Sequence, residues 1–523
     1  MHRRAQRASA WWSNWALALL ITAGLAARLP RLGAPLLEGA AGKQTHTAMV
    51  ARNFYRGRSS WLRPMVDDVG RPGYFVKELP LFPAAAALLY RLNGGVDERL
   101  GRLLSIAAWL SATPFLVALC RHARGPRVGW FAGLWYVLAP LGIAYSRAFM
   151  SDAAMVAASI AALASFARWR RQPGATWALA SSATLALALL LKPHAAFWLV
   201  PGILALLAWQ EKDAPRATVR RGEWLVLSGL VGAAFGLAAI WYLHAAAVHR
   251  QYPVLGATVL TGWVDLSLLG RSSLYAIVGR QELGMVFTPL GALLAVLGFA
   301  LLPSRLEPEE RALLAWGAGV ICQCLVFATR MFDERARGTE YYQLAMVPVA
   351  ALLVARGLEV VAQRAAGWSR VARALAVPIL LVALSDGAAR ATVGALEIPP
   401  GYAALADDCS RVQALTRPDE TILVIADRPG VVLYYCDRRG FTFIPAKLAT
   451  GVAAPAVAGV TSEALSQALS SSDHVLYPFA DMLAATPQLA AHLESEWREL
   501  PTGSPQMRLF ARVPPGAGSG GRP

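Results

Sequence analysis

The sequence predicts an all-α polytopic membrane bundle of about eleven transmembrane helices, with a small extracytoplasmic α/β domain at its C-terminal end. Hydrophobic residues make up 56% of the 523-residue chain and charged residues only 16%, whereas soluble globular chains carry about a quarter of charged residues. The mean hydropathy is +0.42. Apolar runs of membrane-spanning length recur up to about residue 390, and the sequence becomes more polar after that point.

The predicted spans are the apolar runs of about 17 to 25 residues, the length that crosses the hydrocarbon layer. They lie near residues 11–28, 100–120, 127–146, 152–168, 174–191, 194–209, 223–246, 286–303, 312–329, 341–357 and 372–388. The first run follows Arg3, Arg4 and Arg7 without a small-residue cleavage pattern, so we expect an uncleaved anchor with a cytoplasmic N-terminus. Alternate loops are then rich in Lys and Arg, as the positive-inside rule requires, and an odd number of spans leaves the C-terminal domain outside.

Three parts follow from this organisation: residues 1–390 as the transmembrane domain, 391–513 as the extracytoplasmic α/β domain, and 514–523 as a Pro/Gly-rich disordered tail. Within the α/β domain, Thr421–Ala426 and Val431–Tyr435 are apolar runs typical of strands, and Asp427–Gly430 between them is typical of a turn. Cys409 and Cys436 fall in this domain and are plausible disulfide partners in an oxidising compartment.

Two external loops, residues 29–99 and 247–285, are long. In the first, Thr45–Gly57 places apolar residues on one helical face and polar residues on the other, as in a helix lying in the membrane interface. Leu81–Leu92 is apolar but short, so it is predicted as a second interfacial helix. The alternative is that Leu81–Leu92 is a span, which would invert the orientation of everything downstream.

The formal net charge of +17 is compatible with nucleic acid, an anionic membrane or a phosphorylated substrate. The sequence has no Walker loop and no GxGxxG after a strand, which disfavours a protein driven by ATP or a dinucleotide. Charged residues at a membrane boundary are costly and therefore indicate function, and here they gather on the external side. They are Glu38, Lys43, His46, Arg52, Lys77, Glu78, Arg147, Asp152, Lys192, His194, Arg330, Arg335, Arg337 and Glu340.

Several of these residues allow more than one interpretation. The arginines of Arg330–Glu340 suit bidentate binding of a lipid phosphate, or are solvated loop charges. Tyr341 and Tyr342 contact a ligand or belong to the aromatic belt at the interface. Asp152 caps a helix, pairs with Arg147, or acts in catalysis. Burial near the membrane raises the pKa of a loop carboxyl group towards the range of a general base, which makes Glu38 and Glu78 further candidates.

Five motifs occur in a characteristic order over about residues 10–360. They are Glu38–Gly57, Glu78-Leu79-Pro80-Leu81, Ser146-Arg147 through Asp152, Leu191-Lys192-Pro193, and Glu340-Tyr341-Tyr342-Gln343-Leu344. This ordered set resembles the C-type membrane glycosyltransferases related to protein O-mannosyltransferases and the lipid A aminoarabinose transferase. The resemblance implies inverting transfer of a sugar from a polyprenyl-phosphate donor to a glycan, lipid or protein acceptor, on the outer side of the bacterial cytoplasmic membrane. Nucleic acid is not an expected partner.

The resemblance also implies roles for residues. An acid of the first external loop activates the acceptor, and Asp152 matches a second acid after the third span. His46 stands where many relatives carry Asp, so both Glu38 and His46 remain candidates for the first-loop group, with Glu78 nearby. The expected substrate-binding residues are Lys43, Gln44, Arg52, Arg147, Lys192, His194, Arg330, Arg335, Arg337, Glu340, Tyr341 and Tyr342.

No cofactor is expected to be required, although a divalent cation is possible. The main alternative function is a lipid-linked sugar flippase or secondary transporter without transferase activity. A transporter predicts ionisable residues near the midplane and paired inverted halves. This sequence instead has its charges on one side of the membrane, which favours the transferase. A polymerase or ligase of surface polysaccharide would share the donor class and differ in acceptor.

Overall fold

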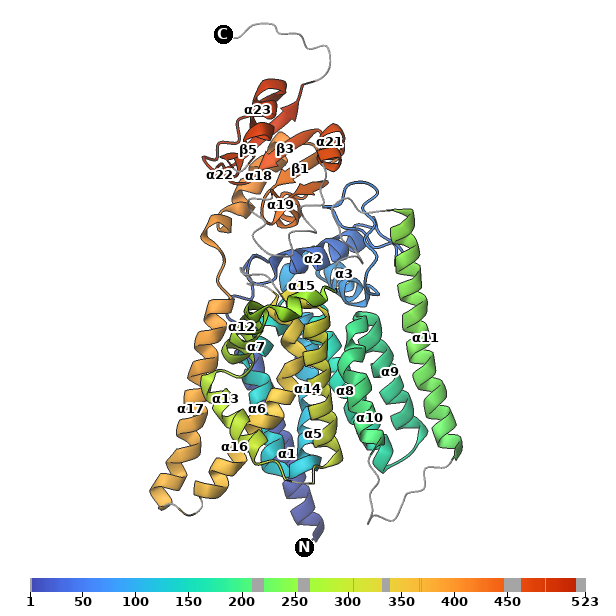
Figure 1. Ribbon diagram of the computed structural model, residues 1–523, viewed down its shortest axis with the longest axis vertical. Helices are drawn as coiled ribbons and strands as arrows, with labels where there is room; N and C mark the ends of the chain where they lie inside the picture. The colour runs from blue at the N-terminus through green and yellow to red at the C-terminus, as the bar shows by residue number, and fades with distance from the viewer. Residues whose placement is uncertain are drawn as a thin grey trace.

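The computed structural model describes residues 2–208, 221–252, 264–303, 305–331, 339–365, 367, 369–445, 462–484 and 486–513. A helical bundle carries a layer of short loop helices at one end, and the C-terminal domain lies on that layer (Figure 1). The first helix begins at the opposite end of the bundle (Figure 1). The protein therefore has two different ends, and the described parts of the predicted external loops lie towards the C-terminal domain.

Every apolar run predicted from the sequence contains a helix. The bundle helices are α1 (His2–Ala26), α4 (Glu98–Ser111), α5 (Thr113–Arg124), α6 (Pro126–Leu138), α7 (Pro140–Ser146), α8 (Asp152–Arg171), α9 (Ala175–Leu191), α10 (Ala196–Leu207), α11 (Arg221–Gln251), α13 (Pro289–Ala300), α14 (Pro308–Val326), α16 (Val347–Ala365) and α17 (Arg370–Ala395). Short helices η1 (Pro193–Ala195), η2 (Leu266–Gly270), α12 (Ser272–Gln281), η3 (Glu282–Val286), α15 (Ala328–Met331) and η4 (Glu340–Met346) lie between them.

The predicted number of eleven spans is not confirmed. Among the described residues, three helices are long and apolar enough to cross a membrane, namely Glu98–Arg124, Arg221–Gln251 and Glu340–Ala365. The number rises to five if each of two bent helix pairs counts as one span. The lower number has a structural reason: prolines such as Pro140 and Pro289 begin new helices after bends of 52° and 97°, and α9 and α10 have only 17 and 12 residues.

Close packing of the bundle depends on small residues and on one buried arginine. A Cβ at Gly298 or Gly357 would collide with the backbone of the other helix of the α13–α16 pair, so glycine allows these two helices to approach closely. Arg28, which is fully buried, donates hydrogen bonds to Ser146 Oγ at 2.5 Å and Val137 O at 2.8 Å. These bonds fix the end of α1 against α6 and α7.

The first external loop contains helices α2 (Ala41–Tyr55) and α3 (Leu81–Asn93). Both predicted interfacial helices are thus confirmed as helices, and α3 packs against α2 at the end of the bundle (Figure 1). Arg52 and Asn53 on the polar face of α2 are buried. Arg52 contacts Tyr434 O of the C-terminal domain, and Asn53 contacts Met65 O and Asp67 of the first loop itself. The amphipathic pattern therefore arises from a position between two protein layers and not from contact with water.

The C-terminal domain is an α/β domain, as predicted. Its elements are η5 (Pro400–Tyr402), α18 (Leu405–Leu415), β1 (Thr421–Ile425), α19 (Pro429–Cys436), β2 (Arg439–Phe443), α21 (Ser462–Ser470), β3 (His474–Tyr477), α22 (Asp481–Ala484), α23 (Pro487–Glu496), β4 (Trp497–Leu500) and β5 (Arg508–Arg512). The sheet has the strand order β2-β1-β3-β5-β4, in which β2, β1 and β3 are parallel and β5 and β4 are antiparallel to their neighbours. Strand β2 is therefore an edge strand.

One predicted strand of this domain is wrong. The run Val431–Tyr435 lies in helix α19, because Pro429 occupies the first helical position, which suits the fixed φ of proline. Val431, Val432, Leu433 and Tyr434 are all buried, so the run shows no alternation. A short apolar run of this kind does not distinguish a buried strand from a buried helix.

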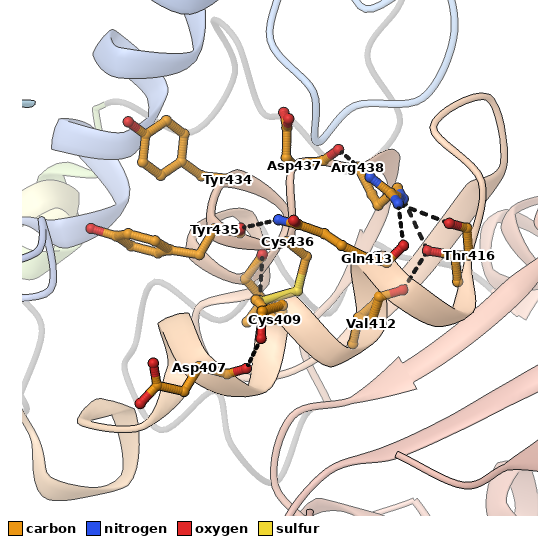
Figure 2. The surroundings of a disulfide bond; sticks show 12 residues. Asp407, Cys409, Val412, Gln413, Thr416, Tyr434, Tyr435, Cys436, Asp437 and Arg438 are labelled. Carbon is orange, nitrogen blue, oxygen red and sulfur yellow. Dashed lines mark hydrogen bonds between the residues drawn. A yellow bond between two sulfur atoms is a disulfide. The ribbon is translucent and has the colours of Figure 1, made fainter. Parts of the chain in front are cut away.

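A disulfide bond joins Cys409 of α18 to Cys436 of α19 (Figure 2), which confirms the pairing expected from the sequence. Next to it, Gln413 Nε2 donates a hydrogen bond to Tyr435 O at 3.1 Å. The two helices are therefore linked covalently and by a hydrogen bond on the side of the domain that faces the first external loop.

Candidate active site

Four charged side chains form a line of alternating sign where the bundle meets the first external loop. Lys43 Nζ of α2 lies 2.7 Å from Glu78 Oε1, and Glu78 Oε1 lies 3.9 Å from Lys192 Nζ. Lys192 Nζ in turn lies 2.6 Å from Asp152 Oδ1. The side chains of Lys192 and Asp152 are almost completely buried, whereas those of Lys43 and Glu78 are about one quarter exposed. Three segments distant in sequence thus contribute to one ionic cluster.

The helices explain why these residues meet. Helices α8 and α9 follow each other directly and pack together, so the start of α8 and the end of α9 lie at the same end of the bundle. Asp152 is the first residue of α8, where a carboxylate complements the helix dipole. Lys192 directly follows α9 and precedes Pro193, and the residue before a proline favours extended backbone.

Glu78 is held by the backbone around it. Leu79 N donates to Leu190 O at 3.1 Å, which joins this loop to the end of α9. Trp241 Nε1 of α11 donates to Lys77 O at 2.9 Å. The position of the Glu78 carboxylate relative to Lys192 is therefore fixed by two helices of the bundle.

An open pocket lies next to the cluster and contains about 460 Å³ of space free of protein atoms. Its polar lining comes from Lys43, His46, Thr47, Lys77, Glu78 and Ser151, and its apolar lining includes Val50, Phe75 and three prolines. Lys77 Nζ lies 4.3 Å from the centroid of the Phe75 ring. A polar ligand group would therefore meet both amines and a carboxylate, with apolar surface beside it.

The charges of Lys43 and Glu78 stabilise each other. Burial alone would raise the pKa of Glu78, but Lys43 and Lys192 hold it well below its usual range. Burial would lower the pKa of Lys43, but Glu78 and Asp152 raise it to about 12. Both groups are therefore charged at neutral pH, and Glu78 is better suited to electrostatic stabilisation than to accepting a proton.

Glu38 lies apart from this pocket. Its carboxylate is buried, with Glu38 Oε1 3.1 Å from Arg102 NH2 and 3.8 Å from Arg147 NH2. Burial raises the pKa of Glu38, as predicted, although both arginines oppose the shift. Arg147 also donates to Arg31 O at 2.7 Å. Pairing of Arg147 with Asp152, one of the alternatives left open by the sequence, does not occur, because Asp152 pairs with Lys192 and Arg147 faces Glu38.

Gln44 and Arg52, both predicted to bind substrate, hold the loop in place. Gln44 Nε2 donates to Gly39 O at 2.9 Å, and Gln44 Oε1 accepts from Phe149 N at 3.0 Å. Arg52 lies 2.9 Å from Asp67 Oδ2 and 3.2 Å from Asp437 Oδ1 of the C-terminal domain. These bonds hold the loop and the C-terminal domain together, and the substrate binding predicted for both residues stays a prediction.

The two tyrosines predicted to bind substrate, Tyr341 and Tyr342, lie next to Lys192. Tyr341 and Tyr342 stack with a centroid separation of 4.5 Å, and Lys192 Nζ lies 5.5 Å from the Tyr341 centroid. Glu340 Oε2 accepts a hydrogen bond from Tyr145 Oη at 2.7 Å. His194 packs near Trp198 and Tyr342. This group supports Lys192 from the bundle side.

The predicted arginine cluster is only partly covered by the structure. Arg330 lies in the short helix α15, whereas Arg335 and Arg337 lie outside the described residues. Their predicted contact with phosphate therefore stays a prediction.

No pattern in the sequence pointed to Asp68 or Asp437. His46 Nε2 lies 2.5 Å from Asp68 Oδ2, and Asp437 binds Arg52 and Arg56 across about 380 residues of sequence. The His46–Asp68 pair lies within the first loop, whereas the pairs of Asp437 arise from the contact between this loop and the C-terminal domain. No local pattern encodes either. Across the part of the chain that the structure describes, no group of three or more His, Cys, Asp or Glu side chains could hold a metal ion.

Residues 77–242 match the family model of dolichyl-phosphate-mannose-protein mannosyltransferases. No curated protein sequence matches the chain significantly. Among solved structures, the chain is similar to apo ArnT from Cupriavidus metallidurans, with 15% identity and a TM-score of 0.65 over 97% of this chain and 98% of ArnT. It is also similar to ArnT bound to undecaprenyl phosphate, with 14% identity and a TM-score of 0.62 over 96% of this chain and 99% of ArnT.

A third similar structure is the apo oligosaccharyltransferase of Archaeoglobus fulgidus, with 14% identity and a TM-score of 0.55 over 97% of this chain and 75% of that protein. The family match over residues 77–242 and the similarity of the fold to ArnT together confirm the resemblance to C-type membrane glycosyltransferases noted in the sequence.

Proposed function

We propose that this protein transfers a sugar from a polyprenyl-phosphate donor to a glycolipid, polysaccharide or protein acceptor, with inversion at the anomeric carbon. The observation that carries the proposal is the pocket in which Lys43, Lys77 and Glu78 lie beside the buried pair Lys192–Asp152. The similarity to ArnT bound to undecaprenyl phosphate supports a lipid phosphate as the donor class. Cationic groups beside an apolar wall suit a ligand that combines phosphate with a lipid chain.

In this proposed reaction, Lys43 and Lys192 stabilise the leaving phosphate. The bond between the anomeric carbon and the phosphate oxygen breaks, and the lipid phosphate leaves with the electron pair. Its negative charge grows as the bond breaks, so fixed ammonium groups stabilise the transition state more than the ground state. Lys43 and Lys192 are already held in place by Glu78 and Asp152, and little reorganisation is needed during the reaction.

The acceptor hydroxyl or amine must lose a proton as it attacks. We propose His46 as the first-loop base and not Glu38, because His46 lines the pocket while Glu38 is buried between Arg102 and Arg147. Asp152 and Glu78 then contribute negative charge near the anomeric carbon, where positive charge develops. Because the leaving group is a phosphate ester, the proposal requires no cofactor.

We also propose an orientation of the chain in the membrane. The N-terminus is placed in the cytoplasm, and the pocket and the C-terminal domain outside, at the bacterial cytoplasmic membrane. The basic residues near the N-terminus and in alternate loops support this orientation. Donor and acceptor would then meet at the outer surface.

The test is reconstitution of the purified protein in liposomes with polyprenyl-phosphate sugars and a panel of acceptors. We expect a transfer product from the wild type and a loss of about 100-fold for Lys43→Met, which removes one amine of the pocket. The matched control is Lys212→Met, a lysine in a predicted cytoplasmic loop. Movement of the lipid-linked sugar across the bilayer without any transfer product would favour the flippase instead.

A further inference from the structure

We infer that Asp68 is a positioning residue that orients the imidazole of His46 in the pocket, and that the C-terminal domain holds Asp68 in place. This inference rests on the proposed function and adds a residue to its site. It also gives the C-terminal domain a role in the reaction.

The pair has the geometry of an oriented base. His46 Nε2 lies 2.5 Å from Asp68 Oδ2, and the side chain of Asp68 is 6% exposed while that of His46 is 30% exposed. The imidazole also makes an edge contact with Phe75, with ring centroids 5.2 Å apart. Since Nε2 is bound to the carboxylate, Nδ1 is the nitrogen that remains for a ligand.

Asp68 is fixed by backbone bonds to the C-terminal domain. Gly440 N donates to Asp67 O at 2.8 Å, and Gly70 N donates to Gly440 O at 2.7 Å. Residues 67–70 therefore run along β2, the edge strand of the C-terminal sheet. An edge strand presents free N–H and C=O groups that readily accept an added segment, and here the added segment carries Asp68.

A glycine of the C-terminal domain lies directly against the pair. A Cβ at Gly430, the second residue of α19, would collide with Asp68 Oδ2 and lie 3.5 Å from His46 Nε2. No side chain fits at this position without displacing the carboxylate. Helix α19 of the C-terminal domain thus packs directly against the His46–Asp68 pair, so this domain contributes to the site.

The chemical consequence concerns the tautomer of His46. When Asp68 accepts a hydrogen bond from Nε2–H, the lone pair of the neutral imidazole is on Nδ1. Nδ1 can then take the proton of the acceptor while the acceptor oxygen or nitrogen bonds to the anomeric carbon and the lipid phosphate leaves. The proton is passed on to the leaving phosphate or to water. The carboxylate also stabilises the imidazolium that forms in this step.

Other charged groups also lie close to His46. Lys43, Lys77 and Glu78 line the same pocket, so a change in activity at one pH does not identify the base. A purely structural His46–Asp68 pair would affect stability or KM. The decisive readout is therefore the separation of kcat from KM, together with chemical rescue by imidazole.

The first test compares Asp68→Asn with the wild type in the reconstituted transfer assay. We expect kcat to fall about 100-fold, the usual range for general base catalysis, while KM for the donor changes less than about threefold. Imidazole in the buffer should partly restore His46→Ala but not Asp68→Asn. The double variant should be no slower than His46→Ala alone, because the two residues act as a unit.

The second test avoids any change at the pair itself. Gly430→Ala displaces Asp68 through its Cβ, and we expect a loss of kcat similar to that of Asp68→Asn. The matched control is Gly401→Ala in the same domain, where the new Cβ would make only ordinary contacts of 3.6 Å or more with Phe479. Wild-type kcat in both Asp68→Asn and Gly430→Ala would overturn the inference and leave the proposed function intact. Absence of transfer by the wild type would overturn both.

Discussion

Lys192 Nζ lies 2.6 Å from Asp152 Oδ1, and both side chains are almost completely buried where α9 ends and α8 begins. The second oxygen, Asp152 Oδ2, is buried and makes no hydrogen bond within the described structure. A buried carboxylate oxygen without a partner is costly, and such a group is one that a bound ligand can satisfy. The Lys192–Asp152 pair therefore links the end of α9 to the start of α8 and also presents a buried carboxylate oxygen that a ligand can bind.

The variant Asp152→Asn tests this relationship. It removes the charge that compensates Lys192 and the carboxylate that faces the anomeric carbon in the proposed reaction. We expect the rate of sugar transfer to fall about 100-fold and the free energy of unfolding to fall by about 3 kcal/mol, since one partner of a buried ion pair is left without compensation. Transfer assays and thermal unfolding in detergent measure the two effects.

The control for Asp152→Asn is Asp419→Asn in the C-terminal domain. Asp419 Oδ1 lies 3.7 Å from Arg417 Nε, but both side chains are more than two thirds exposed, and such pairs contribute about 0–1 kcal/mol. We expect this variant to behave like the wild type. Undiminished transfer in Asp152→Asn would remove Asp152 from the active site.

The Lys43–Glu78 pair predicts how stability depends on pH. The pKa of Glu78 is lowered in the folded protein, so its contribution is complete above the ordinary Glu value of about 4.3 and is lost as the pH falls towards the folded value. The pKa of Lys43 is raised to about 12, so its contribution is complete below about 10.4 and is lost as the pH rises through about 12.

Thermal unfolding of Glu78→Gln and Lys43→Met across pH 3 to 12 checks this dependence. We expect Glu78→Gln to flatten the acid side of the stability curve. Lys43→Met should flatten the alkaline side. Parallel curves for the variants and the wild type would mean that the pair contributes nothing to stability.

Some features of the fold follow from local patterns in the sequence, and others depend on packing between distant segments. The position of α3 and the disulfide Cys409–Cys436 follow from local apolarity and from the compartment. The helical state of Val431–Tyr435 does not, because it depends on packing on both sides of α19. The number of spans is not confirmed, since an apolar run in the sequence does not reveal that a helix such as α10 is short or bent.

The residues of the candidate site also differ in whether the sequence could predict them. Asp152 and Lys192 could be predicted because each lies at a helix boundary with its own local motif. The partner of Arg52 could not, because Asp437 lies in another domain and no periodicity connects the two. Polar residues on α2 suggested a surface exposed to the membrane interface, whereas burial of Arg52 and Asn53 requires knowledge of the C-terminal domain.

Arg52→Ala is predicted to weaken the contact between the first loop and the C-terminal domain. Arg52 is 7% exposed and compensates the buried Asp67, so its loss should lower the free energy of unfolding by about 3–5 kcal/mol. Arg56→Ala is the matched control, because Arg56 also binds Asp437 but is 30% exposed and should contribute about 0–1 kcal/mol. Limited proteolysis of the C-terminal domain measures the difference, and equal protection of both variants would contradict it.

Transfer is predicted to continue after removal of divalent cations. The proposed reaction neutralises the leaving phosphate with Lys43 and Lys192, both fixed by carboxylates. Incubation with EDTA should therefore change the transfer rate less than about twofold, whereas metal-ion catalysis typically supplies several kcal/mol. Loss of transfer with EDTA and its recovery with Mg²⁺ or Mn²⁺ would show that a cation takes part.

The disulfide Cys409–Cys436 is predicted to stabilise the docked C-terminal domain. It closes a segment with a sequence separation of 27 residues, for which a stabilisation of about 3 kcal/mol is typical. Its loss should act on the pocket as well, because α19 carries Gly430 against Asp68 and Tyr434 O against Arg52. Cys409→Ser with Cys436→Ser should therefore lower both the unfolding temperature and the transfer rate. Cys322→Ser, at an exposed free cysteine, is the control, and a double variant indistinguishable from it would show that α19 docks without the disulfide.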